Sequence, residues 1–507
     1  MALAEMNIAA YHGVSHEPLT EPEDGVRHNC GVAAFYFNTP DSLSNLIPAL
    51  TSLNHRGQEG VGVVGLLPDR TMTIHRDEGL VKDNVRQIVR ADADVHIALG
   101  HDRYSTSGGV DAWQPFGEEG ERIVTAHNGN ITNPLSFLND IPLEERTILS
   151  SDTHVLHKAL NAQPEESVEE RIQKILPRVE GAYSLTIADR DTNSLYLIRD
   201  PSGFRPLHYA PLDNGNGYMA ASESVAFIPF VRDATKVIEI LPGQCIRIDA
   251  DGVSEIPIDF PETKSAQCIF ELVYLGGAAS EIFNTNVHAF RRACGENLAE
   301  VDIEHGFIPD IIVPIRDSGA AATEGYSMKF IEHLARAGYS PEEIGARIPR
   351  EALLRNNSVQ RTFILPKGRG SAVTEKFTII PDVVRGKKVV LIDDSVVRGN
   401  TMTHLIQMLL DEGASEVHVR SASPPVRHGC YYGVDFSGSD QELIAVGKTE
   451  QQIAEIIGAH SIAYINLQDM VGIAKTMSGR ENDFCTACFD GNYPVAVDPD
   501  LLLGKAC

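Results

Sequence analysis

The apolar and polar positions divide the chain into two regions of different organisation. In the first region, apolar runs that are typical of strands occur at residues 30–37, 61–66, 72–75, 96–99, 123–126, 183–187, 195–198 and 245–248. Helical patterns occur at 45–54, 152–160 and 168–179. Short strands separated by turns, together with helix pairs, predict a layered α+β domain.

The second region begins after residues 251–264, where Gly, Pro and acidic residues cluster without periodicity. Beyond this segment, units of strand, loop and helix recur, with strands expected at 311–315, 389–392 and 417–420. Such units predict a parallel α/β sheet with ligand loops at the carboxyl ends of its strands. We therefore expect a leader at 1–29, a first domain at 30–255, a second domain at 256–470 and a tail at 471–507.

The most informative unit spans Val389–Thr401. Four apolar residues are followed by Asp393 and Asp394 and then by a small polar loop, which opens a helix expected over 403–412. A loop at a helix N-terminus directs N–H groups at an anion. The two acids would repel a bare phosphate, but they suit sugar hydroxyls or Mg²⁺. The unit thus predicts a ribose-phosphate site, and spacing alone leaves open a plain βα turn whose acids cap the helix.

Composition and charge narrow the function classes. The formal net charge is −27, and this field opposes binding to nucleic acid or to an anionic membrane. The chain has no apolar run long enough to span a bilayer, and residues 1–29 lack the apolar core of a signal peptide. Eight Cys are too few for a disulfide framework in 507 residues, so the cytoplasm is the expected location.

Candidate catalytic residues lie in polar motifs of the first region. Residues 100–106 and 127–130 are polar, turn-rich ends of apolar strands, where side chains can converge on a cleft. Cys30 lies at the start of another strand, and taken alone it fits an inert thiol. Together with residues 55–59 and 151–152, these motifs resemble the glutaminase domain of N-terminal-nucleophile amidotransferases.

This resemblance implies specific roles. The Cys30 thiolate would attack the glutamine amide, and its own α-amino group, freed by removal of residues 1–29 as a propeptide, would act as general base. The Asn128 side chain and the Gly129 N–H would stabilise the oxyanion. The residues that bind glutamine would be Arg56, Arg103 and Asp152. Taken singly, Arg103 and Asp152 also fit a surface ion pair or a helix cap.

Four cysteines suggest a metal group. Cys485 and Cys488 form a C-x-x-C, which alone fits a redox pair, half of a zinc site or two plain thiols. Their surroundings, and those of Cys268 and Cys430, resemble the cluster cysteines of iron–sulfur glutamine phosphoribosylpyrophosphate (PRPP) amidotransferases. The resemblance implies a [4Fe–4S] cluster on these four residues that ties the tail to the domain body.

The segment 389–401 resembles the PRPP loop of type I phosphoribosyltransferases, and residues 30–500 as a whole resemble amidophosphoribosyltransferases. The implied fold is an N-terminal αββα glutaminase domain joined to a parallel-sheet phosphoribosyltransferase domain. Ammonia from glutamine would pass through an internal channel to PRPP and displace pyrophosphate, giving 5-phosphoribosylamine in purine biosynthesis. Purine nucleotides would be feedback inhibitors, and the chain would form a homodimer or homotetramer.

The same resemblance assigns the PRPP site. Asp393, Asp394 and Ser318 would hold Mg²⁺, and residues 358–376 would form a flap that closes over PRPP. The implied PRPP contacts are Asp317, Ser318, Gly319, Arg361, Lys376, Asp393, Asp394, Ser395, Val396, Val397, Arg398, Gly399, Asn400 and Thr401.

Several positions depart from the family pattern. Asn400 stands where the loop normally has Thr, Arg316 replaces a Pro, Asn357-Ser358 lacks a Tyr, and Asp102 replaces a small uncharged residue. Three alternatives therefore stay open. The chain could be another glutamine amidotransferase, such as a glucosamine-phosphate synthase, although that class lacks 389–401. It could also be a catalytically weakened PRPP-binding regulator, or a phosphoribosyltransferase that uses free ammonia.

Overall fold

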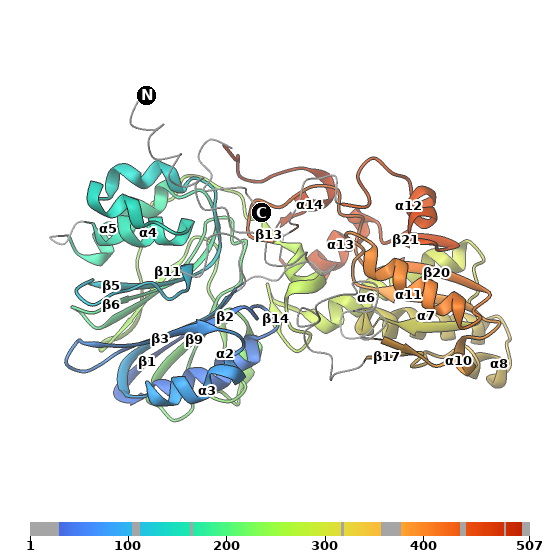
Figure 1. Ribbon diagram of the computed structural model, residues 1–507, viewed down its shortest axis with the longest axis horizontal. Helices are drawn as coiled ribbons and strands as arrows, with labels where there is room; N and C mark the ends of the chain where they lie inside the picture. Colours follow the sequence, from blue (N-terminus) through green and yellow to red (C-terminus); the bar gives the residue numbers. More distant parts are fainter. Residues whose placement is uncertain are drawn as a thin grey trace, which may run out of the picture.

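The computed structural model describes residues 30–103, 112–162, 166–315, 319–355, 377–434, 436, 443–480 and 483–498. Figure 1 shows two halves side by side, the first built on two stacked sheets and the second on one smaller sheet flanked by helices. Within the described residues, no helix is both long and apolar enough to cross a membrane.

The first half is an αββα sandwich. Its seven-stranded antiparallel sheet has the order β10 (Ile238–Glu239), β8 (His208–Pro211), β9 (Gly217–Ala221), β1 (Gly31–Ser42), β4 (Asp94–Arg103), β2 (Gly60–Leu66) and β3 (Met72–Glu78). Its five-stranded sheet has the order β12 (Gly252–Glu255), β11 (Cys245–Asp249), β7 (Ser194–Arg199), β6 (Gly181–Asp189) and β5 (Ile123–Ile131). Helices α2 (Leu46–Leu53) and α3 (Val81–Arg90) cover the first sheet, and α4 (Asp152–Asn161) and α5 (Val168–Ile175) cover the second.

Successive side chains of each strand alternate between the two faces of the sheet, and this alternation produces the layers. In β1, Ala33 and Phe35 belong to the core beneath α2 and α3, whereas Val32 and Ala34 belong to the core between the sheets. Successive side chains of a strand point to opposite faces, so a strand that is apolar at every position is buried on both. The inner face of each sheet therefore meets the other sheet, and polar residues at the ends of these strands face one another.

The second half contains a four-stranded parallel sheet in the order β16 (Ile311–Pro314), β19 (Lys388–Asp393), β20 (Glu416–Ser421) and β21 (Ser461–Tyr464). Helices α6 (Val287–Glu304), α7 (Ala320–Arg336) and α13 (Leu467–Ser478) pack on one face, and α11 (Asn400–Asp411) and α12 (Glu450–Ile457) pack on the other. Both faces are covered, which explains why β19 is an uninterrupted apolar run.

Shorter elements complete the structure. They include the paired strands β13 (Gln267–Cys268) with β22 (Phe484–Cys485), β14 (Glu281–Ile282) with β15 (Thr285–Asn286), and β17 (Leu353–Arg355) with β18 (Phe377–Ile379). The short helices are α8 (Pro341–Gly345), α10 (Pro381–Val384) and α14 (Ala487–Asp490), and η8 (Glu271–Leu275) is a π-helix. The short 3₁₀ helices are η1 (Leu43–Asn45), η3 (Pro134–Asp140), η4 (Leu143–Ile148), η5 (Leu176–Arg178), η6 (Ser224–Phe227) and η7 (Ala234–Lys236).

The predicted fold class is confirmed, but several predicted boundaries are wrong. The strands expected at 96–99 and 123–126 are longer in the structure, where residues 101–103 belong to β4 and residues 127–130 belong to β5. The reason is pairing, because every residue of β5 is matched by one of β6. Helix α11 begins at Asn400 rather than at Thr403, and α3, β8, β9 and β21 were not predicted. The expected flap at 358–376 lies outside the described residues.

Candidate active sites

The first candidate site lies where the strand ends of the two sheets face each other. Gly31, next to Cys30, pairs with Asp102 of β4, so Cys30 and Arg103 are neighbours across this ladder. Burial lowers the pKa of Arg103, while the charges of Cys30, Glu59 and Asp152 raise it. The structure thus brings a thiol, a cation and an acid together, as the motifs predicted.

The second sheet contributes Asn128 and Gly129. His101 of β4 donates from Nε2 to the carbonyl oxygen of His127 at 3.2 Å, which places β5 directly against the first sheet. Asn128 is fully buried, and neither Oδ1 nor Nδ2 has a hydrogen-bond partner among the residues that the structure describes. An unpaired buried amide costs about 1–3 kcal/mol and calls for an explanation such as a ligand contact. At Gly129, with φ +143°, a Cβ would lie 2.0 Å from the Ala182 oxygen, so no side chain fits.

Asp152 and Arg103 are neither a surface pair nor a helix cap. Their exposed fractions are 7% and 6%, and the N-cap of α4 is Ser151, whose hydroxyl accepts the His154 N–H at 3.2 Å. Asp152 instead accepts the Ile131 N–H through Oδ2 at 2.8 Å. This bond fixes the carboxylate against the end of β5.

Arg56 is fully buried next to Cys30, the predicted nucleophile. It donates from Nε to the carbonyl oxygen of Cys30 at 3.3 Å, and its other nitrogens bind the carboxylates of Glu223 and Glu271. Burial opposes the Arg56 charge, but Glu271 and Glu223 raise its pKa above the ordinary value. Sequence reasoning missed both acids, because no motif marks residues that are about 170 and 215 positions away.

The second candidate site lies at the carboxyl end of β19. The Asp394 N–H binds Oδ1 of Asp393 at 2.9 Å, and the Ser395 hydroxyl donates to Asp394 Oδ1 at 2.7 Å. At Gly319 a Cβ would lie 2.3 Å from the Ile392 oxygen. The predicted pyrophosphate loop therefore adjoins the predicted PRPP loop through Gly319. Asp317, Ser318, Arg361 and Lys376 lie outside the described residues.

The loop after Asp394 ends at a left-handed glycine. Gly399 has φ +87° and is the N-cap of α11, a helix of twelve residues. Val396 and Val397 are buried, and the Val397 carbonyl accepts the Ile444 N–H at 2.9 Å. The loop is thus anchored by its apolar residues, while Asn400 is exposed at the first turn of the helix, where the dipole favours anions.

The four predicted cluster cysteines also gather in one place. Cys268 of β13 pairs with Cys485 of β22, and the Cys488 thiol interacts electrostatically with those of Cys268, Cys430 and Cys485. Burial raises the pKa of Cys268 to about 12 and those of Cys485 and Cys488 well above the ordinary value. Across the described ranges, no three His, Cys, Asp or Glu side chains form a ready-made site for a metal ion.

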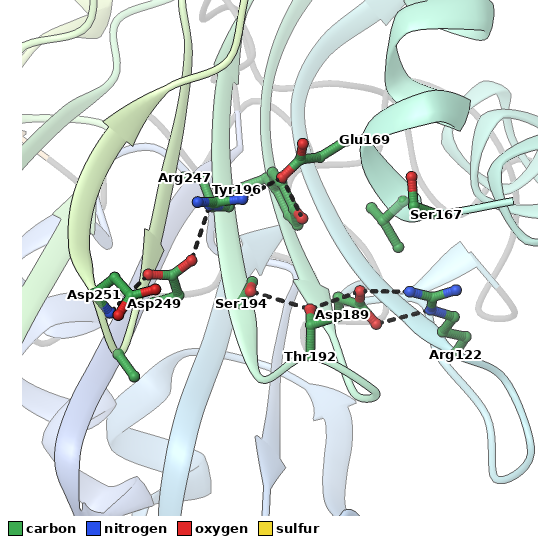
Figure 2. A pocket seen from close by; sticks show the side chains of 12 residues that line it. Arg122, Ser167, Glu169, Asp189, Thr192, Ser194, Tyr196, Arg247, Asp249 and Asp251 are labelled. Carbon is green, nitrogen blue, oxygen red and sulfur yellow. Dashed lines mark hydrogen bonds and ion pairs between the residues drawn. The ribbon is translucent and has the colours of Figure 1, made fainter.

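A pocket of about 370 Å³ opens elsewhere on the first half (Figure 2). It is lined by Arg122, just before β5, by residues of β6, β7, β11 and the start of α5, and by none of the predicted site residues. Its charges are paired internally, with Arg122 on Asp189 at 2.9 Å and Arg247 on Glu169 at 2.6 Å. Since its cations are neutralised by its own acids, the pocket gives no evidence for a ligand.

Together, the fold and the two sites define a glutamine amidotransferase domain joined to a phosphoribosyltransferase domain. Family models agree, since a glutamine amidotransferase domain matches residues 101–229 and a phosphoribosyl transferase domain matches residues 284–425. The chain belongs to the amidophosphoribosyltransferase family. The alternative of a different glutamine amidotransferase is therefore wrong.

Individual relatives support this assignment over nearly the whole chain. The amidophosphoribosyltransferase of Mycobacterium tuberculosis is 35% identical over 94% of this chain and 89% of its own length. That of Methanothermobacter thermautotrophicus is 34% identical over 94% of this chain and 97% of its own length. Among solved structures, glutamine PRPP amidotransferase from B. subtilis, complexed with ADP and GMP, is 30% identical with a TM-score of 0.78, covering 94% of this chain and 99% of that one.

Proposed function

We propose that the chain transfers ammonia from glutamine to PRPP, giving 5-phosphoribosylamine, pyrophosphate and glutamate in the first step of de novo purine biosynthesis. The observation that carries the proposal is the buried Asn128 amide, which has no partner in the described part of the chain and lies on β5, next to the end of β4 that holds Arg103 and adjoins Cys30. A site of this kind serves an enzyme that stabilises an oxyanion.

Glutamine hydrolysis would follow from these residues. The Cys30 thiolate attacks the amide carbon, and the tetrahedral oxyanion receives hydrogen bonds from the Asn128 side chain and the Gly129 N–H. Ammonia leaves as the γ-glutamyl thioester forms, and water then releases glutamate. Arg103 pairs with the α-carboxylate of glutamine, and Asp152 pairs with its α-ammonium. The general base is the Cys30 α-amino group, so residues 1–29 must be removed.

The second domain would hold PRPP. Asp393 and Asp394 contact the ribose hydroxyls, Ser395–Thr401 bind the 5-phosphate at the N-terminus of α11, and residues 317–319 hold the pyrophosphate. Arg361 and Lys376 lie on a flap that closes over the substrate and excludes water. The exposed position of Asn400 at the N-terminus of α11 and the left-handed Gly399 that precedes it support this arrangement.

Mg²⁺ would be held by Asp393, Asp394 and Ser318. Carboxylate and hydroxyl oxygens at a strand end fit a hard cation that keeps several waters and binds substrate phosphates as well, so a complete protein cage is not needed. When bound, Mg²⁺ neutralises charge on the pyrophosphate that leaves.

A [4Fe–4S] cluster would be held by Cys268, Cys430, Cys485 and Cys488. Three buried thiols and the half-buried thiol of Cys430 fit a cluster better than one ion, because a single zinc needs all four sulfurs about 2.3 Å from one point, whereas a cluster spreads its cysteines over several irons. Its role would be structural, joining the tail to the second domain. Anaerobically purified protein should contain iron and acid-labile sulfide, and the absence of both would remove the cluster.

Further features of the proposal follow the family. The chain would be cytoplasmic, with a propeptide at 1–29, a glutaminase domain at 30–255, a phosphoribosyltransferase domain at 256–470 and a cysteine-bearing tail at 471–507. It would assemble as a homodimer or homotetramer. Purine nucleotides would act as feedback inhibitors, in line with the relative that was solved with ADP and GMP.

The direct test is pyrophosphate release from PRPP under anaerobic conditions, with glutamine or with ammonium salts as the nitrogen source. Release with both is expected. Release with ammonium alone would indicate a phosphoribosyltransferase with a silent first domain, and intact mass would then show whether residues 1–29 are still attached. No release with either source would favour the weakened PRPP-binding regulator.

A further inference from the structure

The second half of the molecule reaches the candidate oxyanion strand through the loop after Cys430. Asn130, two residues beyond Asn128 on β5, donates from Nδ2 to the Tyr431 carbonyl oxygen at 2.8 Å. Gly433 packs directly on Gly129, because a Cβ at Gly433 would lie 3.0 Å from the Gly129 carbonyl carbon. The loop 431–433 therefore forms a wall behind the strand that carries the oxyanion donors.

A buried carboxylate of the second half reaches the nucleophile. Glu271, the first residue of η8, accepts Arg56 Nη2 through both carboxylate oxygens at 2.8 Å and Arg205 Nη1 through Oε1 at 2.9 Å. Arg56 in turn binds the Cys30 carbonyl, and Arg205 donates from Nη2 to the Tyr432 carbonyl oxygen at 2.7 Å. Glu271 thus connects the backbone of the nucleophile to the wall loop.

The buried charges of Arg56, Arg205, Glu223 and Glu271 balance only when the two halves of the molecule are in contact. Arg56, Arg205, Glu223 and Glu271 each have an exposed fraction of 0%. Glu223 comes from the first half, and it accepts the Gly277 N–H at 2.8 Å and the Ser280 hydroxyl at 2.5 Å from the second. Leaving one such charge without its partner costs about 3–5 kcal/mol. The network therefore fixes one relative position of the two halves.

The same π-helix also points toward the PRPP site. Arg291 of α6 donates from Nε to the carbonyl of Leu272, the second residue of η8, at 2.9 Å and from Nη2 to the carbonyl of Gly276, which follows η8, at 2.7 Å. Burial lowers the pKa of Arg291, and the negative charge of Asp394 acts in the opposite direction. A single short helix is thus fixed at one end by Arg56 and Arg205 and at the other by an arginine near the PRPP loop.

We propose that Glu271 and the loop 431–433 are positioning elements for glutamine hydrolysis. This inference rests on the proposed glutaminase function of the first half. These groups do not touch glutamine; they hold Arg56 and the Gly129–Asn130 backbone, so that the oxyanion donors have their catalytic position only while the second half is seated. Catalytic groups must be held to within about 0.5 Å, and a displacement near 1 Å costs about a hundredfold in rate.

A matched glycine pair tests the wall loop. Gly433 and Gly120 have nearly equal backbone angles, φ +97° and +95°, so Ala imposes similar strain at each. A Cβ at Gly433 meets a backbone neighbour, whereas no atom of a described residue lies within 4 Å of a Cβ at Gly120. For Gly433→Ala we expect kcat for glutamate formation to fall about tenfold to hundredfold while KM for glutamine stays within about threefold. Gly120→Ala should match the wild type.

Two further readouts exclude a general loss of structure. Gly433→Ala should keep ammonia-dependent pyrophosphate release within about twofold of the wild type. Glu271→Gln, which keeps the shape and removes the charge, should show the same selective loss of glutamine-dependent kcat. A wild-type kcat in Gly433→Ala, or an equal loss with glutamine and with ammonium, would overturn the proposal.

The outcomes separate this proposal from the proposed function. Glutamate formation reports on the positioning elements even without PRPP chemistry, and thermal melting then verifies the fold. A wild-type chain that hydrolyses glutamine but releases no pyrophosphate would contradict the proposed overall reaction alone. A wild-type chain that forms no glutamate after removal of residues 1–29 would contradict the glutaminase function, and the positioning proposal would fall with it.

Discussion

The glutaminase site and the PRPP loop are built in opposite ways. The first collects buried side chains from strands that are distant in sequence, so its geometry depends on the register of two sheets and on charges from the second half. The second is one contiguous stretch at the end of a parallel strand, and it presents backbone groups and an exposed helix start. A substitution in the first should therefore remove a chemical step, whereas a substitution in the second should change affinity for PRPP.

Removal of the predicted nucleophile should give the largest difference between glutamine-dependent and ammonia-dependent activity. In Cys30→Ala, glutamine-dependent turnover should fall by more than about a thousandfold, because no thioester forms. Ammonia-dependent pyrophosphate release should persist, since it needs only the second domain. Steady-state assays with each nitrogen source measure both. Loss of both activities would show that the two sites are not separable.

Removal of the Asn128 side-chain amide tests whether this residue stabilises the oxyanion. Asn128→Ala should lower kcat for glutamate formation about a hundredfold to a thousandfold with little change in KM, because the side chain acts on the transition state. Because the Asn128 amide has no hydrogen-bond partner within the described ranges, its removal should not destabilise the fold, and thermal melting checks this. An unchanged kcat would remove Asn128 from the mechanism.

A substitution in the predicted PRPP loop should change the affinity for PRPP. Gly399→Ala forces a side chain into φ +87° and brings its Cβ within 2.6 Å of Ile444 Cδ1. Strain of about 1–3 kcal/mol should raise KM for PRPP about tenfold with both nitrogen sources. Gly458→Ala is the control, because Gly458 has φ +76° at the end of α12 and a Cβ there would meet no described atom within 4 Å. A similar effect in both variants would mean that backbone strain, not the loop, is responsible.

The difference between the two sites also decides what sequence could predict. The PRPP loop is contiguous, so its strand, acids and Gly399 were all predicted from local pattern. The glutaminase motifs were found, but their placement inside β4 and β5 was not, because polar residues in a strand look like turns until the pairing partner is known. Glu223 and Glu271 carry no local signal, whereas the missed helix α3 has Val81, Val85 and Ile88 at helical spacing.

A buried acid in the glutaminase half should make stability depend on pH. Asp102 is 1% exposed, its Oδ2 has no hydrogen-bond partner from any described residue, and burial raises its pKa well above the ordinary value. The folded state therefore holds this proton more tightly than the unfolded state, so stability is greatest in acid and falls as pH rises toward the raised pKa.

Asp102→Asn should remove that loss. At pH 8 its free energy of unfolding should exceed that of the wild type by about 1–3 kcal/mol, and the gap should narrow toward pH 4. Urea titrations at both pH values measure the difference. A gap that widens in acid would mean that Asp102 is stabilised as a carboxylate.

The smallest effect is expected at Asn400. This residue is exposed at the start of α11, so Asn400→Thr replaces an amide donor by a hydroxyl without disturbing the core. We expect KM for PRPP to fall about twofold to fivefold, because the hydroxyl restores a phosphate contact. Initial rates at varied PRPP test this, and an unchanged or higher KM would show that Asn400 suits this loop.

The central claim is that the two differently built sites serve one reaction. The most direct measurement is the ratio of glutamate to pyrophosphate formed by the processed chain supplied with glutamine and PRPP. Equal amounts of the two products are predicted, with both absent when Cys30 is replaced and no ammonium is added. Glutamate formed without pyrophosphate, or pyrophosphate formed from glutamine without glutamate, would contradict the account.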